Sequence, residues 1–291
     1  MDMRGLAPTE TFRQIRQAGV AAERDMLQAT HGVNTHKGAI FSMGIACAAL
    51  GRLDHALWKD PASVLAECSR IAEGVASRDF AKLEAKTSAI SASDTATPSE
   101  AAPSVTAASP AGPTPSAQEA APGSEQAADI AAPGSAQAVD IAAPGAAQEA
   151  PEITAPIPLT VGEKLYLAYG IRGVRGQAED GFPAVLHVGL PVLERELAAG
   201  ADINRAGSVA LLAILCADTD TNLIARGGRK KQLEVTEQVR QLLSQDPSPS
   251  EAVIDDLDRQ FISDNLSPGG SADLLGLCYL LHFLKTEAPN V

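Results

Sequence analysis

A run of polar residues precedes the apolar stretch that starts near Gly38. It reads Gly-Val-Asn-Thr-His-Lys-Gly and contains Asn34, His36 and Lys37. The first turn of a helix leaves backbone N–H groups without partners, and these groups attract anions. Lys37 adds a positive charge, and His36 can donate a hydrogen bond or transfer a proton. The run predicts a phosphate site; the alternative is an ordinary helix cap beside a solvated lysine.

A second run, Ser-Pro-Gly-Gly-Ser-Ala-Asp, precedes another apolar stretch near the carboxyl end of the chain. Ser267, Gly269, Gly270 and Ser271 supply hydroxyls and unhindered backbone. These residues are similar in kind to a phosphate cradle, although the lysine of the P-loop pattern is absent. The alternative is a helix start capped by Ser271. Together the two runs suggest one site for a polyanion.

An acidic run follows a strongly apolar helical stretch. It contains Asp218, Asp220 and Asn222, and Arg226 lies one turn further on. Carboxylates and amides are hard oxygen ligands that suit Mg²⁺, and the arginine would hold metal-bound phosphates. Acidic groups at the carboxyl end of a helix oppose its dipole, so we expect a compensating cation. The alternative is a helix terminus with Asx-turn residues.

A glycine-rich segment between residues 170 and 183 contains Arg172, Arg175 and Glu179. Glycine lets the backbone approach a ligand closely, and the arginine fork matches phosphate oxygens. The glycine spacing does not fit a dinucleotide fingerprint, and no strand precedes the segment. The segment is therefore either part of an anion site or a flexible loop.

The elements that carry these residues are predicted to be helices. Aromatic residues make up 3% of the chain, and alternating β-branched runs are scarce. Apolar residues recur at helical spacing in most of the sequence. We expect helices at residues 11–29, 39–53, 60–77, 160–169, 183–199, 205–217, 231–244, 251–265 and 271–285. The predicted fold class is all-α, a compact many-helix bundle.

A segment rich in Ala, Pro and Ser divides the chain. No Lys or Arg occurs between Lys86 and Lys164, and an eleven-residue repeat with Pro-Gly in each copy runs from Ala120. Such a composition cannot bury a core, so we expect residues 88–158 to be a disordered insert. The flanking parts, 1–87 and 159–291, each contain very apolar helices that must be buried against other helices. We therefore expect the two parts to form one helical domain.

The net charge of −13 belongs mostly to this insert, which holds eight acidic residues and leaves the remainder near −5. An acidic chain without a basic stripe argues against nucleic-acid binding, although a nucleotide substrate is compatible with it. The four cysteines form no Cys-x-x-Cys pair. There is no signal-peptide pattern and no run of about 20 apolar residues. We expect a cytoplasmic protein that does not bind a membrane.

In combination the motifs resemble the triphosphoribosyl-dephospho-coenzyme A synthase family. The matching pieces are GVNTHKGAIF at 32–41, RGQAEDGFP at 175–183, DTNLIARGG at 220–228 and NLSPGGSADLL at 265–275, in the order of the family. The resemblance covers roughly residues 15–88 and 158–283. It implies an all-α enzyme that joins ATP to 3′-dephospho-coenzyme A and releases adenine.

The product of that reaction is the prosthetic-group precursor of the acyl-carrier subunit of citrate lyase or malonate decarboxylase. A further implied partner is the carrier-protein phosphoribosyl transferase that uses the product. The transfer occurs at the anomeric carbon of the ATP ribose, where an oxocarbenium-like transition state is expected. Such a site needs a base for the attacking hydroxyl, assistance for the departing adenine and a clamp on the triphosphate.

We assign hypothetical roles to the residues on this basis. Asp220 is a catalytic residue that holds Mg²⁺ on the triphosphate, together with Asn222 and Asp218. Glu179 is the first choice for the general base, and His36 is the alternative group for proton transfer. The remaining candidates bind phosphate or nucleotide: Asn34, Lys37, Arg175, Arg226, Ser267, Gly269, Gly270 and Ser271.

The chain differs from the family pattern in two ways. Members usually carry Glu at the position of Gln177, which shifts the catalytic burden to Glu179 or Asp180. They also have an amino-terminal segment that would precede Met1, so we expect a misassigned start codon, a partner chain that supplies it, or a degenerate protein.

Two other functions are compatible with parts of the sequence. The run from Asp218 to Asn222 resembles the magnesium-binding run of ADP-ribosyl hydrolases, which also act at an anomeric ribose carbon. A non-catalytic subunit that binds a nucleotide is the other alternative.

Overall fold

The computed structural model describes residues 3–94 and 159–287, and these residues form helices and connecting turns without a strand. The prediction of an all-α fold is therefore confirmed for this part of the chain. The first segment contains α1 (Pro8–Ala29), α2 (Lys37–Arg52), α3 (Pro61–Ala72) and α4 (Val75–Asp94), with a short 3-10 turn at His55–Leu57.

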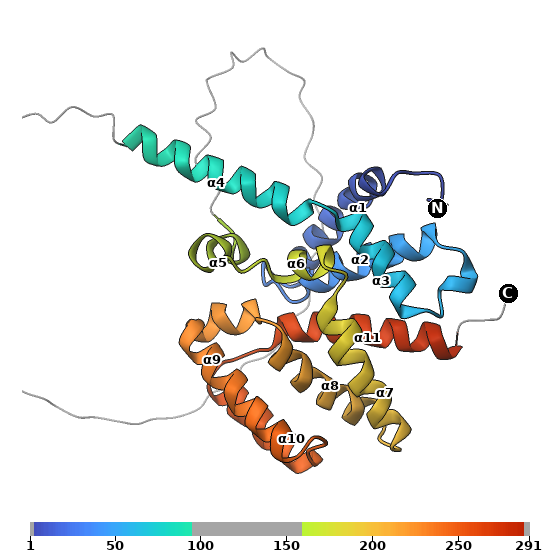
Figure 1. Cartoon of the computed structure of the whole chain (residues 1–291). Helices are drawn as coiled ribbons and strands as arrows, with labels where there is room; N and C mark the ends of the chain where they lie inside the picture. The colour runs from blue at the N-terminus through green and yellow to red at the C-terminus, as the bar shows by residue number, and fades with distance from the viewer. Residues whose placement is uncertain (1–2, 95–158, 288–291) are drawn as a thin grey trace, which may run out of the picture. The chain divides into compact units, whose positions relative to one another are not determined.

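The second segment contains the remaining helices (Figure 1). They are α5 (Val161–Tyr169), α6 (Gly173–Glu179), α7 (Leu190–Ala198), α8 (Ile203–Ala217), α9 (Thr221–Gln245), α10 (Glu251–Ser263) and α11 (Gly269–Glu287), with a π-helical turn at Val185–Gly189 before α7.

Local sequence signals explain several helix boundaries. Asp60 caps α3 by accepting hydrogen bonds from two backbone N–H groups, and Pro61 occupies the first helical position. Thr160 and Glu163 form a capping box at the start of α5, as the sequence predicts. Gly170 ends α5 in the left-handed conformation.

Two predicted helix boundaries were wrong, and one segment weighed as a loop is partly helical. The helix expected to reach residue 77 ends at Ala72, because Gly74 (φ 68°) breaks it and α4 starts anew. The helix expected from residue 231 begins at Thr221 and is kinked at Gly228 (φ 77°). The glycine-rich segment that we considered as a flexible loop contains helix α6.

Helix α4 also extends to Asp94, beyond the boundary expected at residue 87. The stretch from Ser88 is rich in Ala and Ser and has no Pro before Pro98, so nothing in its sequence stops the helix. The remainder of the predicted disordered insert, residues 95–158, lies outside the described residues.

The core joins helices from both segments. Helix α2 packs against α11, α3 and α1, and α8 packs against α7, α9 and α11. Ile45 and Leu65 from the first segment share one buried cluster with Phe182, Ile214 and Leu277 from the second. The apolar helices of the two segments therefore cover each other, and the turns between them are brought to one place.

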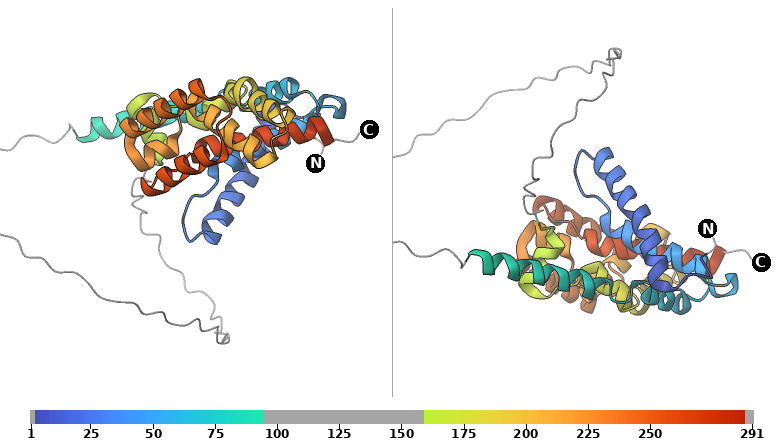
Figure 2. Two further views of the ribbon diagram at one scale, coloured as in Figure 1. Left: turned by 90° about the horizontal axis from the view of Figure 1, so that it is seen from below. Right: turned by 90° about the horizontal axis from the view of Figure 1, so that it is seen from above.

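Helix α1 lies partly against this core. Its contacts are with α2 and α3, and its carboxyl-terminal end projects away from the other helices in Figure 2. That end leaves Val20 and Leu27 exposed, while Met26 is buried. The loop that follows α1 leads to the first polar run.

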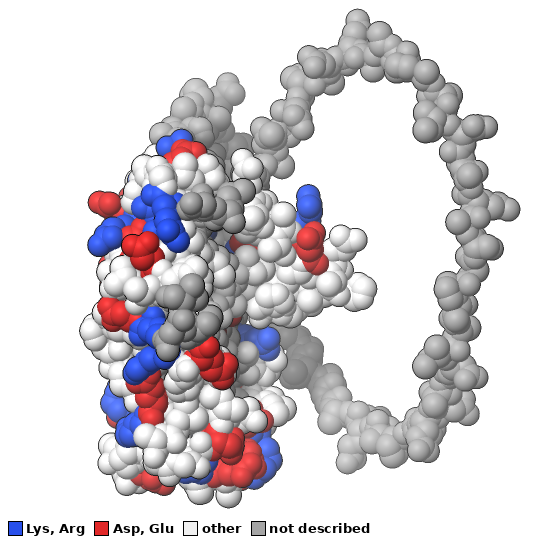
Figure 3. Space-filling model, turned by 90° about the vertical axis from the view of Figure 1, so that its right-hand side faces the viewer, with Lys and Arg blue, Asp and Glu red and all other residues white. Residues whose placement is uncertain are grey.

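The described surface has mixed charge. On the face shown in Figure 3, basic and acidic side chains are interspersed and no large area carries a single sign. No single described helix has the length and apolar character needed to span a bilayer; of the described elements, one bent pair, α8 with α9, meets that test jointly.

Candidate active site

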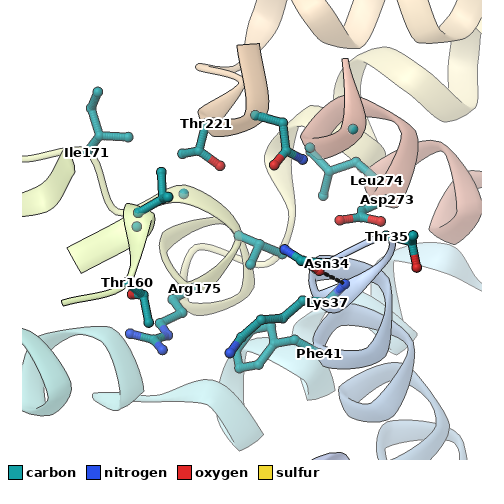
Figure 4. Close-up of a pocket in the computed structure, with 18 of the residues that line it drawn as sticks. Asn34, Thr35, Lys37, Phe41, Thr160, Ile171, Arg175, Thr221, Asp273 and Leu274 are labelled. Atoms are coloured by element: carbon teal, nitrogen blue, oxygen red, sulfur yellow. Dashed lines mark hydrogen bonds between the residues drawn. The ribbon is translucent and has the colours of Figure 1, made fainter. Parts of the chain in front are cut away.

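A cavity of about 650 Å³ lies where the turns from both segments meet. The first segment contributes the end of α1, the following loop and the start of α2. The second contributes the residues before α5, the start of α6, the α8–α9 turn and the start of α11. Figure 4 shows Lys37, Phe41 and Asp273 on one part of its wall and Thr160 with Arg175 on another.

Most of the predicted site residues line this cavity. They are Asn34, Lys37, Arg175, Asp218, Asn222, Arg226, Ser267, Gly269 and Gly270. Four predicted residues are not part of its lining: His36, Glu179, Asp220 and Ser271. Their contacts explain why.

The first polar run caps α2 in a way the sequence did not specify. Asn34 Oδ1 accepts a hydrogen bond from the Lys37 backbone N–H at 3.0 Å. Lys37 Nζ lies 2.6 Å from Glu23 Oε2 of α1. The His36 ring is instead hydrogen-bonded to Thr35 through Nδ1 and Oγ1, which are 2.7 Å apart. Lys37 lines the cavity, whereas the neighbouring His36 does not.

The amino end of α2 is also approached by a carboxylate from α11. Asp273 accepts a hydrogen bond from the Ala39 backbone N–H, and burial raises the pKa of Asp273 to about 6. A Cβ atom on Gly38 would lie 2.1 Å from Asp273 Oδ2, so glycine is required for this approach. The anion that we expected at this helix start is therefore supplied, at least in part, by the protein itself.

Asp220 occupies a comparable position between α9 and α11. Its Oδ1 accepts from the N–H groups of Asn222 and Leu223 at 2.9 and 3.1 Å. Its Oδ2 accepts from the backbone N–H and the hydroxyl of Ser271 at 2.7 and 2.9 Å. The side chain is almost fully buried. Four donors use the acceptor capacity of this carboxylate, so it is not available to coordinate Mg²⁺.

Of the acidic residues expected at the carboxyl end of α8, Asp218 is the C-cap of that helix, whereas Asp220 is not part of that helix end. Asp220 is the N-cap of α9, where the helix dipole favours a negative charge, rather than the end of α8. Ser271 likewise does not cap α11, which begins at Gly269. It is buried against Asp220 and does not reach the cavity.

Asp218 is the acidic residue of this run that lines the cavity. Burial raises its pKa, and hydrogen bonds from the Thr219 backbone and the Gln177 side chain partly offset that effect. Gln177 Oε1 in turn accepts from the Ala184 N–H at 3.3 Å. The amide at residue 177 thus orients the Asp218 carboxylate from the side of α6.

Glu179, the first choice for the general base, does not line the cavity. Its Oε1 accepts from the N–H groups of Ala76 and Ser77 at 2.9 and 3.3 Å, at the start of α4. Its Oε2 lies 3.3 Å from Arg172. Glu179 therefore fixes α6 to α4 and has no contact with the cavity. The sequence around Glu179 does not indicate this contact, because the partners of Glu179 in α4 are more than 100 residues away.

Four basic side chains surround the cavity: Lys37, Arg172, Arg175 and Arg226. Arg175 is 3.8 Å from Asp79 Oδ2 and lies over the Phe80 ring. Arg226 donates to Asn265 Oδ1 at 3.1 Å. This number of cations around one cavity suits a triphosphate, and arginine presents forked donors to its oxygens.

Sequence reasoning missed the apolar part of the lining. Met26, Leu27, Val33, Phe41 and Phe80 contribute to the cavity wall. At helical spacing these residues cannot be distinguished from core residues by sequence alone. Asp273 was present in one of the recognised runs, but we interpreted it only as part of a helix start. The cavity thus combines apolar surface for a base with cations for phosphates.

Within the described residues, no group of three or more His, Cys, Asp or Glu side chains is arranged to hold a metal ion. Mg²⁺ bound to nucleotides commonly uses one or two carboxylates together with waters and phosphate oxygens. Asp218, Asn222 and the neighbouring threonine hydroxyls line the cavity and have the oxygen chemistry of such a partial set.

Comparison with known proteins identifies the relatives of this chain. Residues 2–109 and 101–290 match the model of the ATP:dephospho-CoA triphosphoribosyl transferase family. The 2-(5''-triphosphoribosyl)-3'-dephosphocoenzyme-A synthase of Pectobacterium atrosepticum is 31% identical over 280 residues, which cover 96% of this chain and 68% of the relative. A probable synthase of the same name from Albidiferax ferrireducens is 32% identical over 281 residues, covering 94% and 68%. No solved structure gave a significant match.

Proposed function

The chain belongs to the ATP:dephospho-CoA triphosphoribosyl transferase family, and from this premise we propose that the cavity is the site of triphosphoribosyl transfer. One observation carries the proposal. The four motifs, at residues 32–41, 175–183, 220–228 and 265–275, all contribute side chains or backbone to the wall of the same cavity. Segments separated by most of the chain meet there, around four basic groups.

The reaction transfers the triphosphoribosyl group of ATP to a ribose hydroxyl of dephospho-coenzyme A. The bond between C1′ and the adenine nitrogen breaks, and a bond forms between C1′ and the hydroxyl oxygen. Lys37, Arg175 and Arg226 neutralise the triphosphate, and Arg172 is added to this group because it lines the cavity. Holding both substrates in one orientation lowers the entropic part of the barrier.

The apolar lining has a role in the same step. Phe41 and Phe80 are among the residues that line the cavity, and the Phe80 ring is stacked on Tyr166 at a centroid distance of 3.7 Å. Adenine has a flat π surface that aromatic side chains bind by stacking. We place the adenine against this part of the wall and the triphosphate against the basic groups.

Magnesium belongs to the proposal through Asp218 rather than Asp220. Asp218 and Asn222 would hold the ion, and Mg²⁺ would supply charge neutralisation on the triphosphate when bound. Gln177 keeps the Asp218 carboxylate oriented toward the site through its hydrogen bond. Gly269 and Gly270 admit the side chains of Asn222 and Asp220 close to the start of α11, so their role includes packing as well as phosphate contact.

The product has the chemistry of a prosthetic-group precursor, and we propose that an enzyme that transfers it to an acyl-carrier protein is the next partner. Because both substrates are intracellular nucleotides, we place the reaction in the cytoplasm. We also propose that residues 1–94 and 159–291 act as one catalytic domain, since both segments build the cavity wall.

The test is an incubation of the full chain with ATP, Mg²⁺ and dephospho-coenzyme A, followed by chromatography and mass spectrometry. The proposal predicts free adenine in equal amount to a product that carries the triphosphoribosyl group. Free ADP-ribose released from a modified protein would instead indicate the hydrolase. ATP binding without adenine release would indicate a non-catalytic subunit.

A further inference from the structure

We propose that Asp273 is the catalytic base of this reaction and that Gly38 is required to admit its carboxylate to the start of α2. The inference rests on the proposed function of the cavity. It replaces Glu179, which lies outside the cavity, with a carboxylate on its wall.

Three acidic residues of the described chain line the cavity: Glu23, Asp218 and Asp273. Glu23 forms an ion pair with Lys37 at 2.6 Å. Asp218 receives hydrogen bonds from Gln177 and Thr219 and is the proposed holder of Mg²⁺. Asp273 is engaged by the Ala39 backbone N–H, which leaves further acceptor capacity on its two oxygens.

Asp273 is held near the start of α2, and its carboxylate lies on the cavity wall. It begins the second turn of α11 and approaches Gly38 and Ala39 in the first turn of α2, and Figure 4 shows it on the cavity wall. The missing side chain of Gly38 makes room for Oδ2, which is 2.1 Å from the place a Cβ would occupy. The backbone N–H of Ala39 interacts with the carboxylate, which lies on the cavity wall, where a general base must be to accept a proton from a bound substrate.

The proton affinity of Asp273 suits the task. Burial raises its pKa to about 6, and the nearby charge of Asp220 contributes to the rise. The other charged residues that line the cavity are Glu23, Lys37, Arg172, Arg175, Asp218 and Arg226. At pH 7 to 8 the carboxylate is mostly ionised, yet it is a stronger base than an ordinary aspartate.

The ribose hydroxyl of dephospho-coenzyme A transfers its proton to Asp273 as its oxygen bonds to C1′ of ATP. The electron pair of the C1′–N bond leaves with adenine, which takes one proton from solvent. Asp273 then returns its proton to solvent, so the carboxylate is regenerated and no further reactant is needed.

Gly38→Ala and Gly44→Ala provide a matched pair of variants on one helix. A Cβ at residue 38 would displace the Asp273 carboxylate from the start of α2, whereas a Cβ at residue 44 meets nothing within 4 Å. We expect the turnover number for adenine release to fall at least about tenfold in Gly38→Ala, with the Kd for ATP within about threefold of wild type. Gly44→Ala keeps wild-type turnover.

Asp273→Asn tests the group directly. Loss of a general base lowers the rate by about 10²- to 10⁴-fold. In the wild-type chain the turnover number rises with pH through about 6, because the base form is required. In Asp273→Asn we expect the residual turnover number not to change with pH near 6. Thermal melting and ATP binding are the controls that show that the variant is folded.

The outcomes separate the two proposals. Adenine release by Asp273→Asn at wild-type rate, or an unchanged pH profile, would overturn the role of Asp273 and leave the proposed function intact. No adenine release by the wild-type chain would overturn the proposed function and, with it, this role.

Discussion

Asp220 and Ser271, which are 51 residues apart in the sequence, are joined by two hydrogen bonds of 2.7 and 2.9 Å to the same carboxylate oxygen. The other oxygen caps α9. One buried side chain therefore fixes the start of α9 to the start of α11, and both helix starts border the cavity. We expect Asp220 to position these two helix starts rather than to contact the substrate.

This relationship predicts a large loss of stability in Asp220→Ala. The change leaves four donors without their acceptor, so we expect the free energy of unfolding to fall by about 2–4 kcal/mol. Urea unfolding measures it. Asp202→Ala is the matched control, because Asp202 caps α8 through two backbone N–H groups but is exposed. A loss in Asp220→Ala no larger than in the control would contradict the tertiary role.

Glu179→Gln is expected to change stability and spare catalysis. The carboxylate binds the start of α4 and Arg172, and it does not line the cavity. We predict adenine release within about threefold of the wild-type rate and a lower melting temperature. A loss of activity in a variant that melts like the wild type would restore Glu179 as a candidate base.

Arg175→Ala is expected to weaken ATP binding. Hydrogen bonds to charged groups contribute about 1.5–3 kcal/mol, which corresponds to a KM for ATP raised about 10- to 100-fold. Arg229→Ala serves as the control, since Arg229 lies over the Tyr169 ring and not on the cavity wall. Equal KM values for the two variants would remove Arg175 from the phosphate clamp.

Asp218→Asn is expected to raise the Mg²⁺ concentration needed for half-maximal activity, because a neutral amide is a weaker ligand than a carboxylate. A magnesium titration at fixed ATP measures the change, and a chelator should abolish wild-type activity. The account of Asp218 fails if the variant and the wild type have the same magnesium dependence, or if activity persists in the chelator.

The raised pKa of Asp273 also predicts a stability effect. The folded chain binds its proton more tightly than the unfolded chain, so ionisation destabilises the fold as the pH rises from about 4 through about 6. After allowance for partial exposure, we expect Asp273→Asn to be more stable than wild type at pH 8 by about 1–2 kcal/mol, with no such gain at pH 4. Urea unfolding at the two pH values measures this difference, and a pH-independent difference would argue against the raised pKa.

Helix type was predictable from apolar spacing, and the capping box at Thr160 was predicted residue by residue. Helix α6 was not predictable, because its glycines disfavour a helix and tertiary contacts such as that of Glu179 with α4 hold it in place. The polar runs identified the location of the cavity. The sequence did not reveal which carboxylates face it, because Asp220 and Asp273 take their partners from distant helices.

The most direct test of the central claim uses ATP labelled on adenine and, separately, on the γ-phosphate, incubated with the full chain, Mg²⁺ and dephospho-coenzyme A. Triphosphoribosyl transfer puts the adenine label in free adenine and the γ-phosphate label in the dephospho-coenzyme A product. Release of the γ-phosphate label as inorganic phosphate, with the adenine label still in a nucleotide, would contradict triphosphoribosyl transfer in this cavity.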